Sequence, residues 1–331
     1  MTVVNARATA AKAAALPPAA GIAAAAAGAP PKDVFASIAP ELMVSAVGPR
    51  HVAVLNKFPV IPMHTVVVTR DFMPQAAGLD VSDMQALWLL VARVGGLGFF
   101  NCGPASGASQ PRRHTQFIPY DALRASYPPS FAAKAGPLDL PVEAALAELR
   151  RSTGYGHLPG EVFRVPALPF PHGIVMLGGD VTTAPAATAA RQLHAWYVQL
   201  LLSLFPASSL RPLLQAAAAD GTGAGGGGAA GSMMAAEATP RSPVTGLPLG
   251  VAGASAGAGA DAALPSHNVL LTPRWMMVVP RRCGEWGGVP INAVAFAGLL
   301  LAKGDARSVI ETRGPLDILR ECVGAEGAAI A

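Results

Sequence analysis

The sequence predicts an α+β protein: an antiparallel sheet with helices on one side. Two observations indicate this class. Runs rich in β-branched residues come in pairs joined by short turns, at 51–56 with 64–69 and at 267–272 with 275–280. Elsewhere, apolar residues recur at helical spacing, at 84–91 and at 193–204.

Size and composition limit the class of function. At 331 residues the chain can bury a large core, and its net charge of +4 suits an anionic ligand without the concentrated basic face of a nucleic-acid binder. Three widely separated cysteines, Cys102, Cys283 and Cys322, indicate a reducing compartment rather than a disulfide framework. We interpret Cys102 as a small packing residue. We expect no nucleic-acid or membrane partner, and the oligomeric state is left open.

The chain divides into five parts. Residues 1–40 are rich in Ala and Pro and carry no acidic residue before Asp33, which fits a disordered tail or an organelle transit segment. Residues 213–263 are rich in Gly and Ala and favour a flexible linker. The folded parts are a catalytic region at 41–212 and a C-terminal domain at 264–325, followed by a tail at 326–331. We expect a soluble intracellular protein, cytoplasmic unless the N-terminal segment directs it to an organelle.

Helices are predicted where caps frame an apolar stripe. Asp80 to Asp83 offers N-caps for a helix that carries Met84, Leu87, Trp88 and Val91 and ends at Gly95. Further helices are predicted over 141–151, 188–204, 291–303 and 315–323, and further strands over 162–165 and 173–177. His194 lies within the helix at 188–204 and is interpreted as structural or exposed rather than catalytic.

The segment 99–119, FFNCGPASGASQPRRHTQFIP, carries the clearest chemistry. Small residues such as Gly103 and Gly107 allow backbone amides to approach a phosphate closely, and Arg112 and Arg113 add positive charge. Side chains alternate along the strand that follows, so His114 and Gln116 share one face. A nucleophile and an amide are thus presented at the exit of a phosphate-binding loop.

These residues resemble a known family. The NCGPASGASQ loop and the His114-Thr115-Gln116 motif are similar to those of diadenosine tetraphosphate (Ap4A) phosphorylases, or ATP adenylyltransferases, of the histidine-triad superfamily. The stretches 51–75, 168–172 and 267–304 resemble other parts of that family in the same order. The resemblance implies a histidine-triad-like antiparallel sheet with flanking helices.

The resemblance also implies a set of site residues. His114 would be the nucleophile and Gln116 would bind the transferred phosphate. The expected nucleotide- and phosphate-binding residues are Asn56, Lys57, Asn101, Gly107, Ala108, Ser109, Gln110, Asn268, Thr272, Met277 and Arg281. Gln116 in place of a third histidine favours transfer over hydrolysis.

The function implied is a nucleotidyltransferase that cleaves Ap4A with inorganic phosphate to ATP and ADP through an adenylylated histidine. Two alternatives remain: a histidine-triad transferase or hydrolase acting on another nucleotide, and a non-catalytic nucleotide-binding protein. The second is motivated by Arg112, which replaces the first histidine of the family motif, and by the lack of a recognisable basic N-terminal segment. No metal or tightly bound cofactor is expected, apart from Mg²⁺ that accompanies the polyphosphate.

Overall fold

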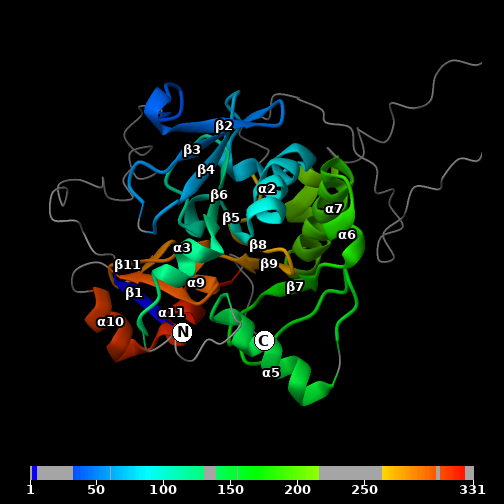
Figure 1. Ribbon diagram of the computed structural model, residues 1–331. Coiled ribbons are helices and arrows are strands. Elements are labelled where there is room, and N and C mark those ends of the chain that lie inside the picture. The colour runs from blue at the N-terminus through cyan, green and yellow to red at the C-terminus, as the bar shows by residue number, and fades with distance from the viewer. Residues whose placement is uncertain are drawn as a thin grey trace, which may run out of the picture.

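The computed structural model describes residues 2–5, 33–59, 61–129, 139–154, 156–215, 263–302 and 306–324. Its centre is an eight-stranded sheet, ordered β2-β3-β4-β6-β5-β8-β9-β7, in which every neighbouring pair is antiparallel (Figure 1). The strands are β2 (Met43–Val47), β3 (His51–Leu55), β4 (Thr65–Thr69), β5 (Gly96–Cys102), β6 (His114–Pro119), β7 (Gly173–Met176), β8 (His267–Leu271) and β9 (Trp275–Pro280). The α+β class and both predicted strand pairs are confirmed.

Helices cover both faces of the β5-β8-β9 part of the sheet, where one covered face was expected. On one face Phe100, Val269 and Val278 pack with α2 (Val81–Val94) and α7 (Ala186–Leu204), which lie side by side (Figure 1). On the other face Phe99 and Leu270 pack against a C-terminal layer. This layer comprises α3 (Tyr120–Ala125), α9 (Ala293–Phe296), α10 (Ala306–Arg313) and α11 (Pro315–Glu321). Every residue of β8 and β9 is buried, which explains their almost continuous apolar sequence.

The β3-β4-β6 part of the sheet is covered differently. One face packs on α2 through Ala53 and Val67. On the other face, Val52, Val54, Val66 and Val68 are joined by two side chains of the segment 33–42, Phe35 and Ile38. Val68 is paired with His114 and Val66 with Gln116, so both motif residues lie on this second face.

Local sequence signals explain the confirmed helices. Asp80 and Asp83 form a capping box at the start of α2, and Gly95, with φ 74°, ends it. The helices predicted over 141–151, 188–204 and 315–323 appear as α5 (Val142–Thr153), α7 and α11.

Three sequence predictions were wrong. The helix predicted over 291–303 is only the short α9, because Gly298, with φ 98°, turns the chain and residues Leu299–Ala302 form the strand β12. Part of the predicted tail is ordered, since β1 (Thr2–Asn5) pairs in parallel with β12. Residues 162–165 form no strand but one bridge between Phe163 and Ile174.

The shorter elements include β10 (Glu285–Trp286), β11 (Val289–Pro290) and α6 (Gly179–Thr183). Short 3-10 helices lie at Pro40–Leu42, Gln75–Ala77, Pro104–Ser106 and Ala207–Leu210. The predicted linker at 213–263 and the tail at 326–331 lie almost wholly outside the described residues. Within the described ranges, no helix combines the length and apolar character needed to cross a membrane.

Candidate active site

His114 is the first residue of β6, and its side chain is buried. Its Nδ1 lies 2.8 Å from the backbone oxygen of Arg112. Since a carbonyl only accepts, Nδ1 carries the proton and the lone pair is on Nε2. Burial lowers the pKa of His114, and the bond to Arg112 opposes this effect only in part. The imidazole is therefore neutral near pH 7 and nucleophilic at Nε2.

Two other buried histidines show how His114 differs. His172 and His267 also bond the carbonyl two residues before them through Nδ1, each at 2.7 Å. Their Nε2 atoms are occupied, by the Val165 amide at 2.9 Å and by the Tyr197 hydroxyl at 2.8 Å. Among the described residues, none bonds Nε2 of His114. His114 therefore shares its Nδ1 geometry with His172 and His267 and differs from them in its available Nε2.

The side chain of Gln75 fixes the backbone of His114. The pairing of β5 with β6 ends at Phe99 and Gln116, so Asn101 and His114, two residues further along each strand, do not pair with each other. The Gln75 amide fills this gap: its oxygen accepts from the His114 amide at 2.8 Å, and its nitrogen donates to the carbonyls of Asn101 (2.8 Å) and His114 (3.2 Å). Gln75 was not among the predicted site residues, because a single buried glutamine carries no sequence signal.

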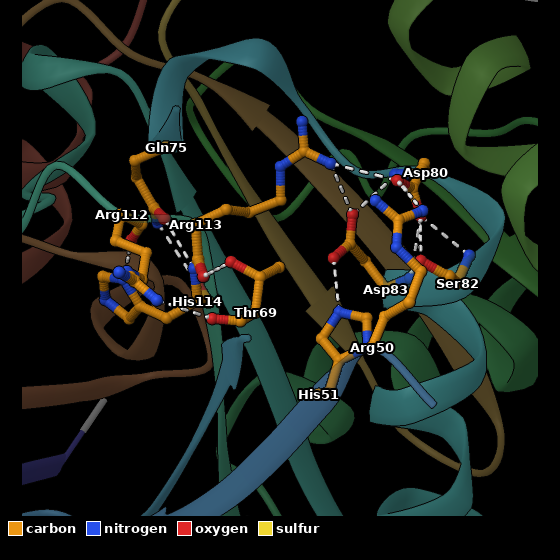
Figure 2. A network of polar contacts seen from close by, with 10 residues as sticks. All are labelled: Arg50, His51, Thr69, Gln75, Asp80, Ser82, Asp83, Arg112, Arg113 and His114. Carbon is orange, nitrogen blue, oxygen red and sulfur yellow. Dashed lines mark hydrogen bonds and ion pairs between the residues drawn. The ribbon is translucent and has the colours of Figure 1, made fainter. Parts of the chain in front are cut away.

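The guanidinium of Arg112 is used away from the reactive nitrogen. It bonds Asp33 at 2.7 and 2.8 Å and the carbonyls of Thr69 and Arg70 at 3.2 and 2.7 Å. The backbone of Arg112 orients His114, while its side chain ties segment 33–38 to the end of β4. Figure 2 shows Arg112, Thr69 and Gln75 gathered around His114.

A buried ionic cluster supports the same strand from the opposite face. Asp83 bonds His51 at 2.7 Å and Arg113 at 2.9 Å, and Arg113 also reaches Asp80 (Figure 2). Burial would raise the pKa of Asp83, but the Arg113 charge and the His51 hydrogen bond outweigh it and hold that pKa well below its usual range. The cluster joins the start of α2 to the residue before His114.

Gln116 is held by two residues from the β3-β4 connection. Its Oε1 lies 2.8 Å from Nε2 of His64, and Nδ1 of His64 lies 3.1 Å from Nδ2 of Asn56. The backbone amide of Phe58 donates to Oδ1 of Asn56 at 3.0 Å. The predicted binding residue Asn56 thus lies near the site, and His64 is a residue that the sequence analysis missed. Lys57 is exposed, with its ammonium 5.8 Å from the centre of the Phe58 ring.

The loop between β5 and β6 has the features of an anion cradle. Gly103 and Gly107 adopt φ values of 78° and 83°, and a Cβ on Gly107 would lie 2.6 Å from the Ile291 carbonyl oxygen. The amides of Gly107, Ala108, Ser109 and Gln110 donate to no acceptor within the part of the chain that the structure describes. Such a run of unpaired amides suits phosphate oxygens.

The remaining predicted residues are buried and bonded to protein groups. Asn268 donates to the side chain of Asn101 at 2.8 Å and to the Ser106 carbonyl at 3.0 Å. Arg281 bonds the side chain of Asn268 and the Ile291 carbonyl, and burial lowers its pKa to about 10. These residues fix the loop to the C-terminal layer.

Thr272 and Met277 lie farther into the interior. The Thr272 hydroxyl bonds backbone atoms of the Thr272–Trp275 turn, and Met277 packs in the core behind Phe99. Neither Thr272 nor Met277 has any exposed surface. Direct substrate contact by these residues and by Asn268 and Arg281 stays a prediction, and would require buried protein contacts to open.

An open cavity of about 260 Å³ lies over β3 and β4 on the same face of the sheet as His114, which is not one of its lining residues. Its lining residues are Phe35, Ala36, Ile38, Met43, Val52, Val68, Thr69, Arg70 and Arg112. The Phe35 ring centre lies 5.4 Å from that of His114. A flat apolar group could enter here while a phosphate occupies the loop.

Fold and site together define a class: an α+β protein that presents one neutral histidine beside a glycine-rich loop with unpaired amides. Two family models identify it further. Residues 21–132 match the Ap4A phosphorylase N-terminal domain, and residues 166–325 match the ATP adenylyltransferase C-terminal domain. The chain belongs to the Ap4A phosphorylase (ATP adenylyltransferase) family.

Curated relatives match over a short region. The chain is 37% identical over 75 residues to diadenosine 5',5'''-P1,P4-tetraphosphate phosphorylase 2 of Saccharomyces cerevisiae, which covers 19% of this chain and 23% of that protein. It is 37% identical over 71 residues to Protein APA1 of the same organism, which covers 19% of this chain and 22% of that protein. The alignments span only a small part of either relative.

The structural likeness is broader. The crystal structure of yeast Ap4A phosphorylase Apa2 gives a TM-score of 0.55 at 22% identity, covering 90% of this chain and 80% of that one. The complexes of Apa2 with Ap4A and with AMP give TM-scores of 0.55 and 0.56, at 20% and 21% identity. These matches cover 89% and 90% of this chain and 81% and 82% of the others. The fold predicted from the sequence is therefore confirmed.

Proposed function

We propose that this chain is an Ap4A phosphorylase, which cleaves Ap4A with inorganic phosphate to ATP and ADP through an adenylylated His114. The observation that carries the proposal is the state of the His114 ring. Its Nδ1 proton is held by the Arg112 carbonyl, and its Nε2 has no hydrogen-bond partner among the described residues. A neutral nucleophile approaches a polyphosphate without the repulsion that an anionic one would meet.

The reaction has two balanced steps. In the first, Nε2 forms a bond to the α-phosphorus, the bond from that phosphorus to the bridging oxygen breaks, and ATP leaves. The ring then carries a positive charge, which the hydrogen bond from Nδ1 to the carbonyl stabilises. In the second step an oxygen of inorganic phosphate attacks the same phosphorus, the P–N bond breaks, ADP leaves and neutral His114 returns.

Different groups around His114 would bind different parts of the substrate. The unpaired amides of residues 107–110 would receive the phosphate oxygens. The cavity beside Phe35 would receive the adenine, whose aromatic faces can lie against an aromatic side chain. Lys57 is exposed, and its ammonium would turn toward the polyphosphate chain. Mg²⁺ would enter with the polyphosphate rather than through protein ligands.

Product analysis tests the proposal. Purified protein is incubated with Ap4A with and without inorganic phosphate, next to the variant His114→Ala. We expect ATP and ADP only when phosphate is present, and none with the variant. Without phosphate, intact-protein mass spectrometry should find one adenylyl group on the wild type. Products that form without phosphate would instead indicate a hydrolase, and binding without turnover would indicate a nucleotide-binding protein.

A further inference from the structure

We propose that His64 is a positioning residue, which holds the side-chain amide of Gln116 with its NH₂ group turned toward the phosphate being transferred. The inference rests on the proposed function for the identity of that phosphate. It rests on the structure alone for the direction of each hydrogen bond.

The backbone amide of Phe58 fixes the direction of these hydrogen bonds. The N–H of Phe58 can only donate, so the atom of Asn56 that it meets at 3.0 Å must be the oxygen Oδ1. The Asn56 side chain cannot turn over without losing this bond. Its Nδ2 therefore faces Nδ1 of His64, at 3.1 Å, and donates to it.

The ring of His64 in turn sets the orientation of the Gln116 amide. Because its Nδ1 accepts, a neutral ring carries its proton on Nε2. Nε2 lies 2.8 Å from Gln116, so it donates to Oε1, and the amide nitrogen of Gln116 is turned the other way. Within the described ranges that nitrogen has no acceptor. Burial lowers the pKa of His64 to about 4, so the ring stays neutral across the physiological range.

The strands keep the three side chains in place. His64 immediately precedes β4, whose residue Val66 pairs with Gln116 on β6. The backbone amide of Asn56 bonds the carbonyl of His64 at 2.8 Å, and the His64 ring lies 5.7 Å from that of Phe99. Gln116 is thus held in β6, whereas Asn56 and His64 lie at the two ends of the β3-β4 connection, which their backbone hydrogen bond closes.

The orientation matters because a glutamine amide has two unlike ends. With NH₂ outward, Gln116 donates to a phosphate oxygen whose charge grows during transfer. With the carbonyl outward, it would present a partial negative charge to the same anion. His64 thus decides whether Gln116 attracts or repels the substrate.

Three substitutions of His64 test whether it sets the orientation of the Gln116 amide. His64→Gln can still donate to Oε1 and should keep kcat within about 10-fold of wild type. His64→Phe loses the donor, and we expect a further fall of about 10-fold, as when partners that orient metal-binding histidines are lost. His64→Glu accepts from the NH₂ group and turns it inward. It should be slowest, with a loss of about 100-fold or more, as for the loss of a transition-state donor.

A second set of variants separates positioning from folding. In a Gln116→Ala background, the three His64 substitutions should change kcat no further, because the group that they orient is gone. His194→Phe is the matched control: this buried histidine bonds the Leu79 carbonyl on the α2-α7 side of the sheet. It should alter thermal stability and leave kcat near wild type.

The ring state can be read without turnover. Long-range proton–nitrogen NMR spectra of ¹⁵N-histidine-labelled protein should show His64 protonated at Nε2. The side-chain NH₂ signals of Gln116 should move when AMP is added. A wild type with no turnover would refute the proposed function while leaving this test intact. A proton on Nδ1 of His64, equal kcat in all three variants, or the same losses in the Gln116→Ala background would each overturn the inference.

Discussion

Replacing Gln75 by leucine should destabilise the fold and displace the nucleophile together. Gln75 is 5% exposed, and its amide bridges β5 and β6 where their own pairing has stopped. Leucine has a similar size and fills the space, but it can neither accept from the His114 amide nor donate to the two carbonyls. Water has little access to the gap, so these backbone groups would stay without partners.

The size of the effect follows from the three lost bonds. A buried N–H without an acceptor costs about 2–3 kcal/mol, and each carbonyl, which keeps a second lone pair, costs about 1 kcal/mol. The free energy of unfolding should therefore fall by about 4 kcal/mol. Since the His114 backbone is no longer fixed, kcat should also fall, by about 100-fold for a displacement of about 1 Å.

Urea unfolding followed by tryptophan fluorescence measures the first effect, and Ap4A turnover measures the second. Gln199→Leu is the matched control, because Gln199 is only half-buried and makes one long bond, 3.4 Å, to the Gly160 carbonyl. It should change the unfolding free energy by less than about 1 kcal/mol. If Gln75→Leu changed it equally little, the bridging role argued for Gln75 would be wrong.

Four further predictions concern the same site. The kcat/KM of the wild type should stay level as pH falls through 6.5 and decline only below it, because the pKa of His114 is lowered and the neutral ring is the reactive form; a decline that begins above pH 6.5 would contradict this. Arg112→His should lower thermal stability and leave turnover unchanged or lower, because the Arg112 side chain bonds Asp33 and two carbonyls; a rise in turnover would mark Arg112 as a defect. Asp83→Asn should lower the free energy of unfolding by about 3–5 kcal/mol at pH 7, because Arg113 loses the negative charge of this partner. Because the pKa of Asp83 is lower in the folded chain, its contribution is present above about pH 4 and is lost as pH falls further, so urea midpoints of the variant should depend less on acid than those of the wild type. Gly107→Ala should raise KM for phosphate and Ap4A, whereas Gly154→Ala, also at positive φ but with open space around it, should leave both kinetic constants unchanged; equal effects would mean that contact with Ile291 is unimportant.

The sequence correctly predicted the elements that local signals alone determine. Paired β-branched runs predicted β3, β4, β8 and β9, and the caps at Asp80 and Gly95 predicted α2. Alternation along 114–118 correctly placed His114 and Gln116 on one face. These features depend on neighbours in the chain, so they can be read without knowing the tertiary contacts.

The wrong or missing predictions concern residues whose structure depends on contacts with distant parts of the chain. Leu299 to Ala302 are apolar on every side and carry no period that separates strand from helix; they became a strand because residues 2–5 pair with them. Gln75 and His64 bond groups 39 and 52 residues away, which no local pattern reveals. Asn268 lies in a predicted strand and Arg281 directly follows one, and their bonds to the Ser106 and Ile291 carbonyls likewise join distant segments.

The unequal covering of the sheet has a consequence for local unfolding. His114 stands between β4 and β5, next to strands packed on both faces, so its amide should exchange with solvent only when the whole sheet opens. Segment 33–42 and the β3-β4 connection lie on the face of β3, β4 and β6 that has little other covering. Opening them should therefore require much less free energy. Segment 33–42 can therefore exchange or unfold locally while His114, the proposed nucleophile, keeps its geometry.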